Sequence, residues 1–410
     1  MIRAEWNSLK KVMLHRPGME INYAMFAPKA FLFERPFNYM RAIEEHKMLE
    51  EKLKENNINV IILKDEIIKK ALESDAFMDK LREKVISIVK YYGTKELIEN
   101  ARNDLEKNIK YIDPETLFNA FITELSIDLK SYLNGIEYPT VYSNLPLANL
   151  YFMRDQQAIS SGIIIGNMRM NQRRKETDIT EFFFREVLNE NRIARVKNGY
   201  FEGGDFMPAG SFAIIGTGSR TDINGAIDAM NSGLMDFDEI LIVNNPNYDF
   251  MSYNPQFNMH LDTYFNIAGD GIVVTSENLI KNAAATIYQK NGDKYERAFE
   301  TTLFDYIKKR DFNIIDMNLA EQLSYSSNFL TLSDKKIIAV DSKRIIEKLI
   351  EEKVFPGNIE GMIKKQISNE FMPDKRAMID HGIDVIKIDL SEITGGYGGA
   401  HCMSSAIIRN

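Results

Sequence analysis

The only cysteine of the chain, Cys402, lies close to the C-terminus in the stretch GGAHCMSS. A cysteine side chain becomes a nucleophile when its surroundings favour the thiolate form. A buried cysteine can instead pack as a small apolar side chain, and the stretch CMSSAII is apolar enough for that role. Which interpretation holds depends on whether acid, base and binding groups gather around the thiol.

Three other segments carry side chains suited to acid–base chemistry or to binding a cation. They are NLYFMRDQQ with Asp155, FEGGDFM with Glu202 and Asp205, and MHLDTYF with His260 and Asp262. His260 and Asp262 are two positions apart, so on a strand their side chains share one face. Each segment also has an ordinary structural interpretation: an Arg–Asp ion pair, a glycine turn or a packed histidine.

A pocket that joined these groups would hold four carboxylates, one imidazole and one thiol. The sequence has no HExxH motif, no CxxC motif and no second histidine at ligand spacing, so we expect neither a metal nor another cofactor. Carboxylates that cluster without a metal suit an organic cation. A guanidinium is planar and donates in forks, so two carboxylates can hold it while its central carbon faces a thiolate.

A repeated pattern after residue 145 can bring these segments together. A polar signature is followed by an apolar strand and a polar turn in four units: RDQQAISSGIIIGNM, GGDFMPAGSFAIIGTGSR, LDTYFNIAGDGIVVTSEN and SSNFLTLSDKKIIAVDSKR. The tail HCMSSAIIRN supplies the first half of a fifth unit, and the N-terminal EWNSLKKVMLHRP supplies the second half. A fifth unit shared by both ends would close the units into a ring, with every signature near one axis. The alternative is an open α+β sheet whose strands only look alike.

The chain before this repeat divides into two parts. Residues 11–17 and 58–63 predict strands and residues 38–57 predict a helix between them. From about 65 to 140 the pattern indicates helix alone, with an N-cap and first-turn proline at Asp113 and Pro114. One helix there carries an apolar stripe, formed by Phe77, Met78, Leu81, Val85, Ile88 and Val89. We therefore expect a catalytic α/β domain over 1–64 and 145–410 and an inserted, all-helical subdomain, a helical bundle, over 65–144.

The composition fits a soluble globular protein of the cytoplasm. Of 410 residues, 44% are hydrophobic and 27% are charged, enough apolar sequence for a large core. The N-terminus lacks the pattern of a secretory signal, and no apolar run approaches the ~20 residues that span a bilayer. The net charge of −8 argues against a nucleic-acid partner and is compatible with a cationic substrate.

Taken together, the motifs resemble those of arginine deiminases, members of the guanidine-modifying (pentein) superfamily. The resemblance rests on LKKVMLHRPG, NLYFMRD, RRKET, EGGD, GSRT, MHLDT and the terminal GGAHCMS, together with the helical insertion. It extends over almost the whole chain. It implies an α/β fold, a five-bladed α/β propeller with pseudo-fivefold symmetry.

The resemblance also implies a reaction and a role for each matched residue. Cys402 would attack the guanidinium carbon of L-arginine, ammonia would leave, and hydrolysis of the amidino-cysteine would release L-citrulline. Asp155 and Asp262 would clamp the guanidinium, and His260 would protonate the leaving amine and later activate water. Glu202 would hold the imidazole. The residues expected around the rest of the substrate are Asn149, Phe152, Arg173, Asp205, Arg220 and Tyr397, with the two arginines on the α-carboxylate. Asp205 would support either the turn or the substrate.

The loop before the cysteine departs from the family's usual pattern. It reads GYGGAHC, whereas arginine deiminases usually have a loop like GRGGPRC. Tyr397 and His401 stand where two arginines are usual, so the sequence leaves open a second guanidine substrate: agmatine, a substituted arginine or a peptide-linked arginine. A non-catalytic arginine-binding protein is a further alternative. Without those two arginines, the thiol of Cys402 would depend more on the bound cationic substrate to lower its pKa. By the same resemblance we expect a homo-oligomer, a dimer or larger, that acts in arginine catabolism.

Overall fold

The repeated sequence units form small sheets that share one pairing pattern. The structure, a computed structural model, describes residues 2–133, 136–247, 256–367 and 370–410. In each repeat unit, the central strand pairs antiparallel with one neighbour and parallel with another. The triplets, in pairing order, are β20 (Ser405–Arg409), β1 (Leu9–Leu14) and β2 (Asn59–Ile62); β6 (Gln157–Ile159), β7 (Ile163–Ile165) and β8 (Ile193–Arg195); β9 (Phe206–Ala209), β10 (Phe212–Thr217) and β11 (Glu239–Asn244); β12 (Phe265–Gly269), β13 (Ile272–Thr275) and β16 (Asn313–Asp316); and β17 (Leu330–Ser333), β18 (Lys336–Val340) and β19 (Asp384–Ile388).

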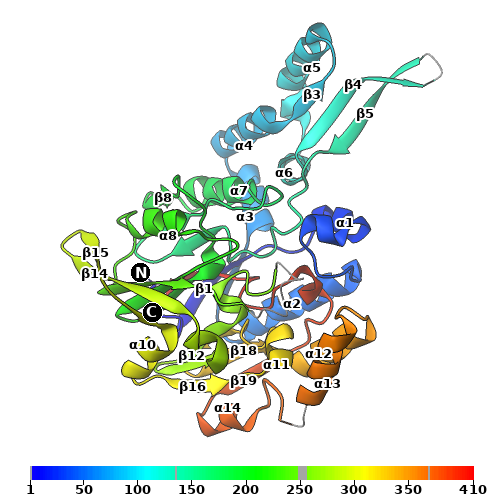
Figure 1. The fold of residues 1–410 in the computed structure, drawn as a ribbon. Helices are drawn as coiled ribbons and strands as arrows, with labels where there is room; N and C mark the ends of the chain where they lie inside the picture. Colours follow the sequence, from blue (N-terminus) through cyan, green and yellow to red (C-terminus); the bar gives the residue numbers. More distant parts are fainter. Residues whose placement is uncertain (1, 134–135, 248–255, 368–369) are drawn as a thin grey trace.

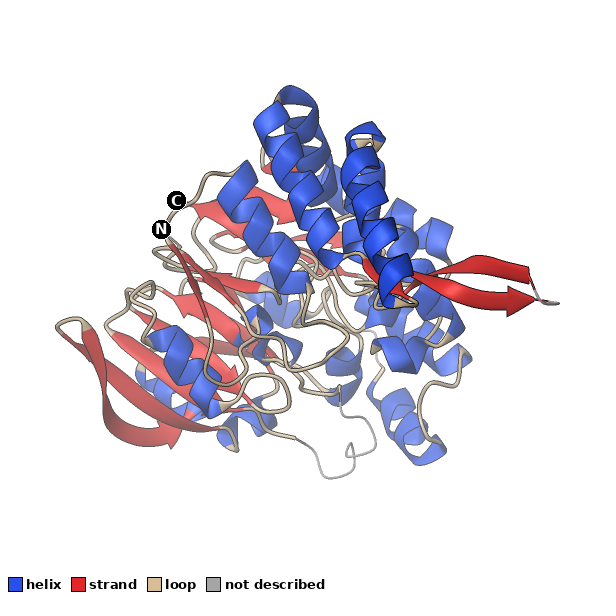
Figure 2. Ribbon diagram, turned by 90° about the horizontal axis from the view of Figure 1, so that it is seen from above, coloured by secondary structure: helices blue, strands red, loops and turns tan. Residues whose placement is uncertain are grey.

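One of these triplets is built from the two ends of the chain. Strand β20 pairs antiparallel with β1, with Val12 opposite Ala406 and Met13 opposite Ser405. The N–H of Ser8 donates to the carbonyl of Asn410 (2.9 Å), and the N–H of Asn410 donates to the carbonyl of Ser8 (3.0 Å). The termini accordingly lie side by side (Figures 1 and 2). The prediction that the two ends share a fifth unit is confirmed.

Helices join and cover the strands of this body. Helix α2 (Tyr39–Glu55) illustrates why they form: Asn38 accepts a hydrogen bond from the N–H of Arg41 (3.1 Å), and the helix buries Leu49 and Leu53. The other helices of the body are α1 (Met19–Phe26), α7 (Glu176–Phe182), α8 (Ile223–Met230), α9 (Glu277–Lys281), α10 (Leu303–Lys309), α11 (Leu319–Leu323), α12 (Ser342–Glu351), α13 (Gly357–Gln366) and α14 (Arg376–Asp380). None of the helices in the described ranges is long and apolar enough to cross a bilayer.

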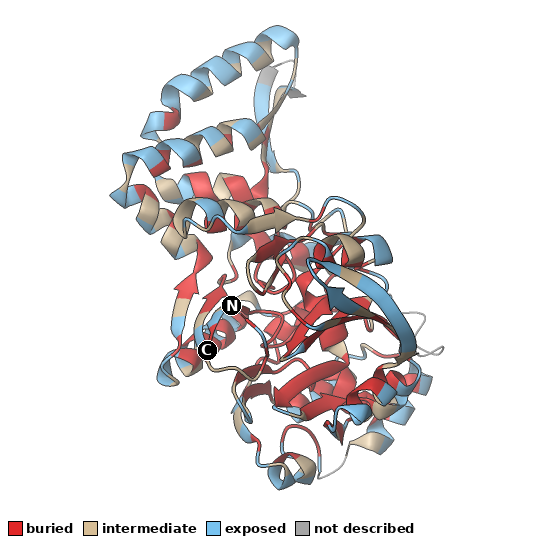
Figure 3. Cartoon of the chain, turned by 90° about the vertical axis from the view of Figure 1, so that its left-hand side faces the viewer, coloured by how far each residue is buried: buried red, intermediate tan, exposed pale blue. Residues whose placement is uncertain are grey.

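The strands of the body are largely buried, and their apolar side chains form the core (Figure 3). Strands β7, β10, β13 and β18 bury nearly every residue because helices or neighbouring sheets cover both faces. A long hairpin of β14 (Ala284–Asn291) and β15 (Lys294–Thr302) extends the sheet beyond β11, and most of β15 is exposed. The core therefore holds the signatures at the starts of β6, β9, β12, β17 and β20 in fixed positions.

Residues 63–143 project from the body (Figure 1). Helix α4 (Asp75–Ile88) buries Phe77, Met78, Leu81 and Val85, which belong to the predicted apolar stripe. It packs against α3 (Leu63–Glu73) and α6 (Pro114–Thr123), while α5 (Lys95–Asn108) lies further out. Asp113 caps α6 by accepting from the N–H of Thr116 (2.9 Å), as predicted.

The expectation that this region is all-helical is wrong. It contains β3 (Lys90–Tyr92), β4 (Leu125–Leu133) and β5 (Ile136–Ser143), in which β4 pairs parallel with β3 and antiparallel with β5. The segments LSIDLKSYL and IEYPTVYS are rich in β-branched and aromatic residues, and they flank an Asn-Gly pair, a common hairpin signal. Figure 2 shows the β4–β5 hairpin extending away from the rest of the molecule. Helix packing does not override the preference of these residues for strand in this hairpin.

Candidate active site

Asn328, from another repeat unit, contacts both the backbone and the sulfur of Cys402. The side-chain oxygen of Asn328 accepts from the N–H groups of Cys402 (3.0 Å) and Gly399 (2.8 Å). Its side-chain nitrogen donates to the sulfur of Cys402 (3.1 Å), and the thiol donates to Oδ2 of Asp262 (3.4 Å). Burial raises the pKa of the thiol well above its ordinary value, and the charges of Asp262 and Asp155 raise it further. The group is a neutral thiol at neutral pH unless a cation arrives.

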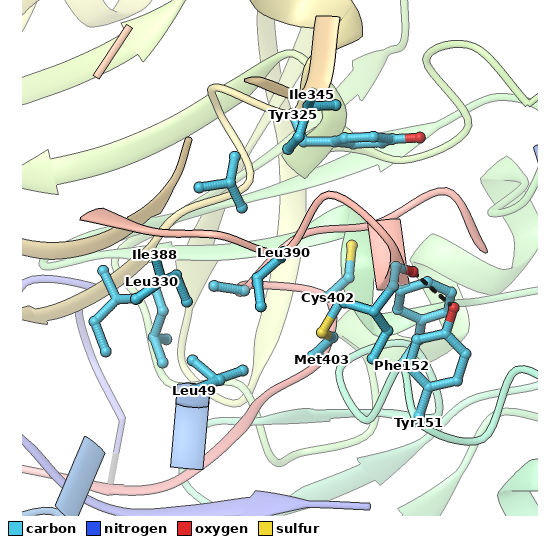
Figure 4. Packing of buried hydrophobic residues seen from close by; sticks show 14 of the residues in the cluster. Leu49, Tyr151, Phe152, Tyr325, Leu330, Ile345, Ile388, Leu390, Cys402 and Met403 are labelled. Carbon is cyan, nitrogen blue, oxygen red and sulfur yellow. Dashed lines mark hydrogen bonds between the residues drawn. The ribbon is translucent and has the colours of Figure 1, made fainter. Parts of the chain in front are cut away.

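The glycines before the cysteine let the chain pass close to aromatic rings. A side chain at Gly398 would place a Cβ 2.5 Å from Phe152 and 2.9 Å from the Cβ of Cys402. Tyr397, just before it, adopts a left-handed backbone conformation with φ of 75°. Figure 4 shows the rings of Phe152 and Tyr151 beside Cys402. Phe152, expected near the substrate, therefore lies against the loop that carries the thiol.

His260 lies between carboxylates of two other repeat units. Its Nε2 donates to Glu202 (2.8 Å), and its Nδ1 lies 3.7 Å from Oδ1 of Asp155. Burial lowers the pKa of His260, but the charge of Asp155 and the hydrogen bond to Glu202 outweigh it and raise the pKa to about 9. Burial raises the pKa of Glu202, whereas Arg220 and His260 together lower it to about 2. The imidazole is therefore protonated at neutral pH.

The prediction that His260 and Asp262 share one face of a strand is wrong. His260 precedes a short 3₁₀ turn, η6 (Leu261–Thr263), and strand β12 begins later, at Phe265. Asp205 fixes this turn, because its Oδ1 accepts from the N–H of Leu261 (2.9 Å) and from Asn245 (2.9 Å). Burial raises the pKa of Asp205 to about 6. Of the two roles expected for Asp205, these contacts match support of the turn.

Asp262 ends a buried chain of polar groups that the sequence did not reveal. Nδ1 of His401 donates to Oδ2 of Asp262 (2.7 Å), and Nε2 of His401 lies 3.8 Å from Oε1 of Glu5. Glu5 is also paired with Arg154 (3.1 Å) and Arg409 (2.9 Å). Burial raises the pKa of Asp262, but the hydrogen bond from His401 lowers it below the ordinary value. His401 thus orients the carboxylate that contacts the thiol, and Arg154 pairs with Glu5.

Asp155 contacts Arg173 as well as His260. Oδ2 of Asp155 accepts from Arg173 (2.5 Å), whose guanidinium also pairs with Glu176 (2.8 Å). Burial lowers the pKa of Arg173, and the charges of Glu176 and Asp155 outweigh it and raise the pKa well above its ordinary value. Arg173 therefore braces one oxygen of Asp155, in addition to any contact it makes with a substrate.

Several buried polar atoms of this cluster have no hydrogen-bond partner among the described residues. Oδ1 of Asp155, Oδ1 of Asp262 and Nδ1 of His260 are among them. A buried carboxylate oxygen without a partner is costly, so such atoms commonly face a ligand or water. Two such oxygens near one thiol form an acceptor set for the N–H groups of a flat cation.

The other expected substrate residues lie at the edge of the cluster. Arg220 is buried against Glu202 (3.5 Å), the sulfur of Met259 (3.5 Å) and Gln256. Asn149 donates to the carbonyl of Phe31 (2.8 Å). The ring of Tyr397 lies under Nζ of Lys29, 5.9 Å away. The structure thus brings the predicted site residues into one region of the molecule. Asn149 and Tyr397 lie at its edge, where Asn149 contacts Phe31 and Tyr397 contacts Lys29.

Sequence reasoning did not select Asn328, Glu5 or Glu176. A signal for Asn328 was present, because it lies in SSNF, the signature of the fourth repeat unit, at the position where other units carry their acids. No comparable pattern marks Glu5, which lies at the opposite end of the chain from Cys402. Only the pairing of the two chain ends brings it close.

Comparison with known proteins agrees with this geometry. Residues 29–409 match the family model described as arginine deiminase. The chain belongs to the arginine deiminase family. It is 26% identical to the arginine deiminase of Limosilactobacillus reuteri, covering all of this chain and 97% of that one. It is 23% identical to the arginine deiminase of Halobacterium salinarum, over 99% and 96% of the two chains.

Solved structures of related fold are more distant. The N-terminal domain of ArgZ, a cyanobacterial arginine dihydrolase, has a TM-score of 0.53 and 11% identity and covers 97% of each chain. A mutant of AgrE in a binary complex with L-arginine has a TM-score of 0.55 and 12% identity, and the match covers 98% of this chain and 40% of that one. These likenesses show that this member of the arginine deiminase family shares an α/β fold with both proteins.

Proposed function

We propose that the protein hydrolyses L-arginine to L-citrulline and ammonia through a covalent amidino-cysteine. The observation that carries the proposal is the pair of unpartnered oxygens on Asp155 and Asp262, which lie in the buried site around one thiol. Membership of the arginine deiminase family supports the same reaction. A guanidinium between the two carboxylates would present its central carbon to Cys402.

In the first half-reaction, the bound cation offsets the charges of Asp155 and Asp262 that keep the thiol protonated. Cys402 then releases its proton to solvent, and the thiolate adds to the guanidinium carbon to form a tetrahedral adduct. His260, protonated at neutral pH, gives its proton to the departing nitrogen. The carbon–nitrogen bond breaks, and ammonia leaves.

In the second half-reaction, the now neutral His260 takes a proton from water. The hydroxide adds to the amidino carbon, and the carbon–sulfur bond breaks while the hydroxyl proton passes to the departing sulfur. Citrulline leaves, and the neutral thiol of Cys402 and the protonated His260 are restored. Glu202 keeps the imidazole in place through both steps by its 2.8 Å hydrogen bond. His401 donates a hydrogen bond to Asp262 and Arg173 donates one to Asp155, and these bonds orient the two clamping carboxylates.

Replacement of Cys402 tests the proposal. The Cys402→Ala variant is expected to form no citrulline or ammonia above background, and Met403→Leu, a change at the adjacent buried residue, is expected to stay within about threefold of wild type. Mass spectrometry of wild-type protein quenched with acid during turnover should show an amidino adduct on Cys402. Citrulline formation by Cys402→Ala, or arginine binding by wild type without product, would contradict the proposal.

A second substrate is favoured by one observation. Tyr397 and His401 stand in the loop before the thiol where arginine deiminases usually have arginines, so this loop lacks two usual cations for a substrate carboxylate. Lys29 lies over the Tyr397 ring, 5.9 Å from its centre. Agmatine or a substituted or peptide-linked arginine is the alternative. The buried guanidinium of Arg220 at the edge of the cluster supports a substrate with a carboxylate.

We also propose the larger arrangement that serves this reaction. The triplets of the five repeat units share one pairing pattern, and the chain ends close one of them, which supports a five-bladed propeller with pseudo-fivefold symmetry over 1–64 and 145–410. Residues 65–144 would form a separate insertion.

Exposed apolar side chains in this insertion, such as Leu72, Tyr111 and Val141, support contact between copies in a homo-oligomer. A catalytic thiol suits the reducing cytoplasm and a role in arginine catabolism.

A further inference from the structure

A small cavity lies next to the cluster of reactive groups. Its lining includes Glu34, Met259, Thr263, Tyr325 and Tyr397. Met259 and Thr263 flank His260 and Asp262 in the sequence, and Tyr397 belongs to the loop before Cys402. The cavity volume is about 30 Å³, room for about two water-sized groups at about 10–15 Å³ each. An ammonium group is of this size.

Glu34 supplies the one carboxylate in this lining. It is buried, and its N–H donates to the carbonyl of Gly395 (2.8 Å), which ties it to the cysteine loop. Tyr325 donates its hydroxyl to Oε2 of Glu34 (3.0 Å), and Tyr325 belongs to the same apolar cluster as Cys402 (Figure 4). Burial raises the pKa of Glu34 to about 7, with Arg35 opposing that shift. A cationic partner would therefore stabilise the ionised form of the Glu34 carboxylate.

The cations near Glu34 are engaged elsewhere. Arg35 pairs with Glu352 (3.2 Å) and donates to the carbonyl of Ser391. Lys29 donates to the backbone carbonyl of Glu34 (2.7 Å). Across the parts of the chain that the structure describes, no lysine or arginine forms an ion pair with the Glu34 carboxylate.

The opposite charge lies behind another part of the lining, one residue away from the cavity. The guanidinium of Arg220 contacts the sulfur of Met259 (3.5 Å) and the side chain of Gln256, and both of these residues line the cavity. A carboxylate in the lining and a guanidinium directly behind Met259 and Gln256 match a group that carries both charges. The α-carbon end of a free amino acid has an ammonium and a carboxylate on one atom, and this charge pattern fits it.

Resting on the proposed function, we propose that Glu34 binds the α-ammonium group of L-arginine and makes the enzyme selective for the free amino acid. Substrates with a blocked or missing α-amino group would leave the buried carboxylate without its partner. Selectivity of this kind is strong because an unpaired buried group is costly. The guanidinium end would be handled by Asp155, Asp262 and Cys402 in every case.

The test compares Glu34→Gln with wild type on two substrates. L-Arginine carries the α-ammonium, and 5-guanidinopentanoate has the same chain and carboxylate without it. Glu34→Gln should raise the KM for L-arginine about 10- to 100-fold, the range expected for a lost hydrogen bond to a charged group. Its KM for 5-guanidinopentanoate should stay within about twofold of wild type. Glu352→Gln, which removes a neighbouring carboxylate outside the cavity, should change neither.

Tyr325→Phe gives a second variant if Glu34→Gln does not fold. It removes only the hydroxyl that positions Glu34, so a smaller rise in KM is expected for L-arginine alone. Equal losses on both substrates, or an unchanged KM for L-arginine, would overturn the assignment of Glu34. Failure of the proposed function looks different, since wild type would then form no ureido product from either compound.

Discussion

Asn328 offers the sharpest test of how the structure controls the thiol. Its side-chain nitrogen donates to the sulfur of Cys402 at 3.1 Å, while its oxygen accepts from two N–H groups of the cysteine loop. The change Asn328→Asp keeps the shape and both accepted hydrogen bonds. It replaces the donor that faces sulfur by an oxygen that repels a thiolate. The loop should therefore stay in place while the thiolate is destabilised.

The size of the effect follows from these contacts. A hydrogen bond to a charged group contributes about 1.5–3 kcal/mol, so losing the donor should lower the thiolate population about 10- to 150-fold. The new carboxylate would lie beside Asp262, which already raises the pKa of the thiol. We expect kcat/KM for L-arginine at neutral pH to fall at least about 10-fold, and the thiol to need a higher pH to react.

Alkylation by iodoacetamide reports the thiol directly, because the chain has one cysteine. The alkylation rate is measured against pH alongside citrulline formation. Asn318→Asp is the matched control: its side-chain oxygen caps α11 by accepting from the N–H of Glu321 (2.9 Å), and aspartate caps helices equally well. Activity of Asn328→Asp within twofold of wild type, or an equal loss in Asn318→Asp, would refute the reasoning.

Two further predictions concern His260 and the projecting region. The pKa of His260 is about 9 when folded, above its ordinary value near ~6.5, so the stability that its charge contributes is complete below about pH 6.5 and is lost as the pH rises through about 9. Glu202→Gln should shift the alkaline limb of the kcat profile to lower pH, and an unmoved limb would contradict this. Leu81→Ala, in the buried stripe of α4, should lower the free energy of unfolding by about 2–5 kcal/mol and leave kcat unchanged. Urea unfolding and citrulline assays measure the two quantities. A large fall in kcat would contradict a separate insertion.

The local patterns of the sequence predicted much of the secondary structure. Helix α2 and the stripe of α4 follow the period of apolar residues, and Asp113 caps α6 as its position before a proline suggests. The β4–β5 hairpin was missed because helical spacing was extended across a segment whose β-branched and aromatic residues favour strand. The turn at His260 was mistaken for strand because two residues at even spacing carry no information about where pairing begins.

The sequence by itself determined which reactive groups exist: one thiol, one imidazole near acids and two aspartates, each in a recognisable motif. It also determined that the chain ends complement each other as strands. Only the tertiary structure decided how these groups act on one another. Glu5, Asn328 and Cys402 come from distant parts of the chain, and their contacts depend on how the sheets pack. Hydrogen bonds and pKa values depend on distance and burial, and these quantities arise only when the core excludes water.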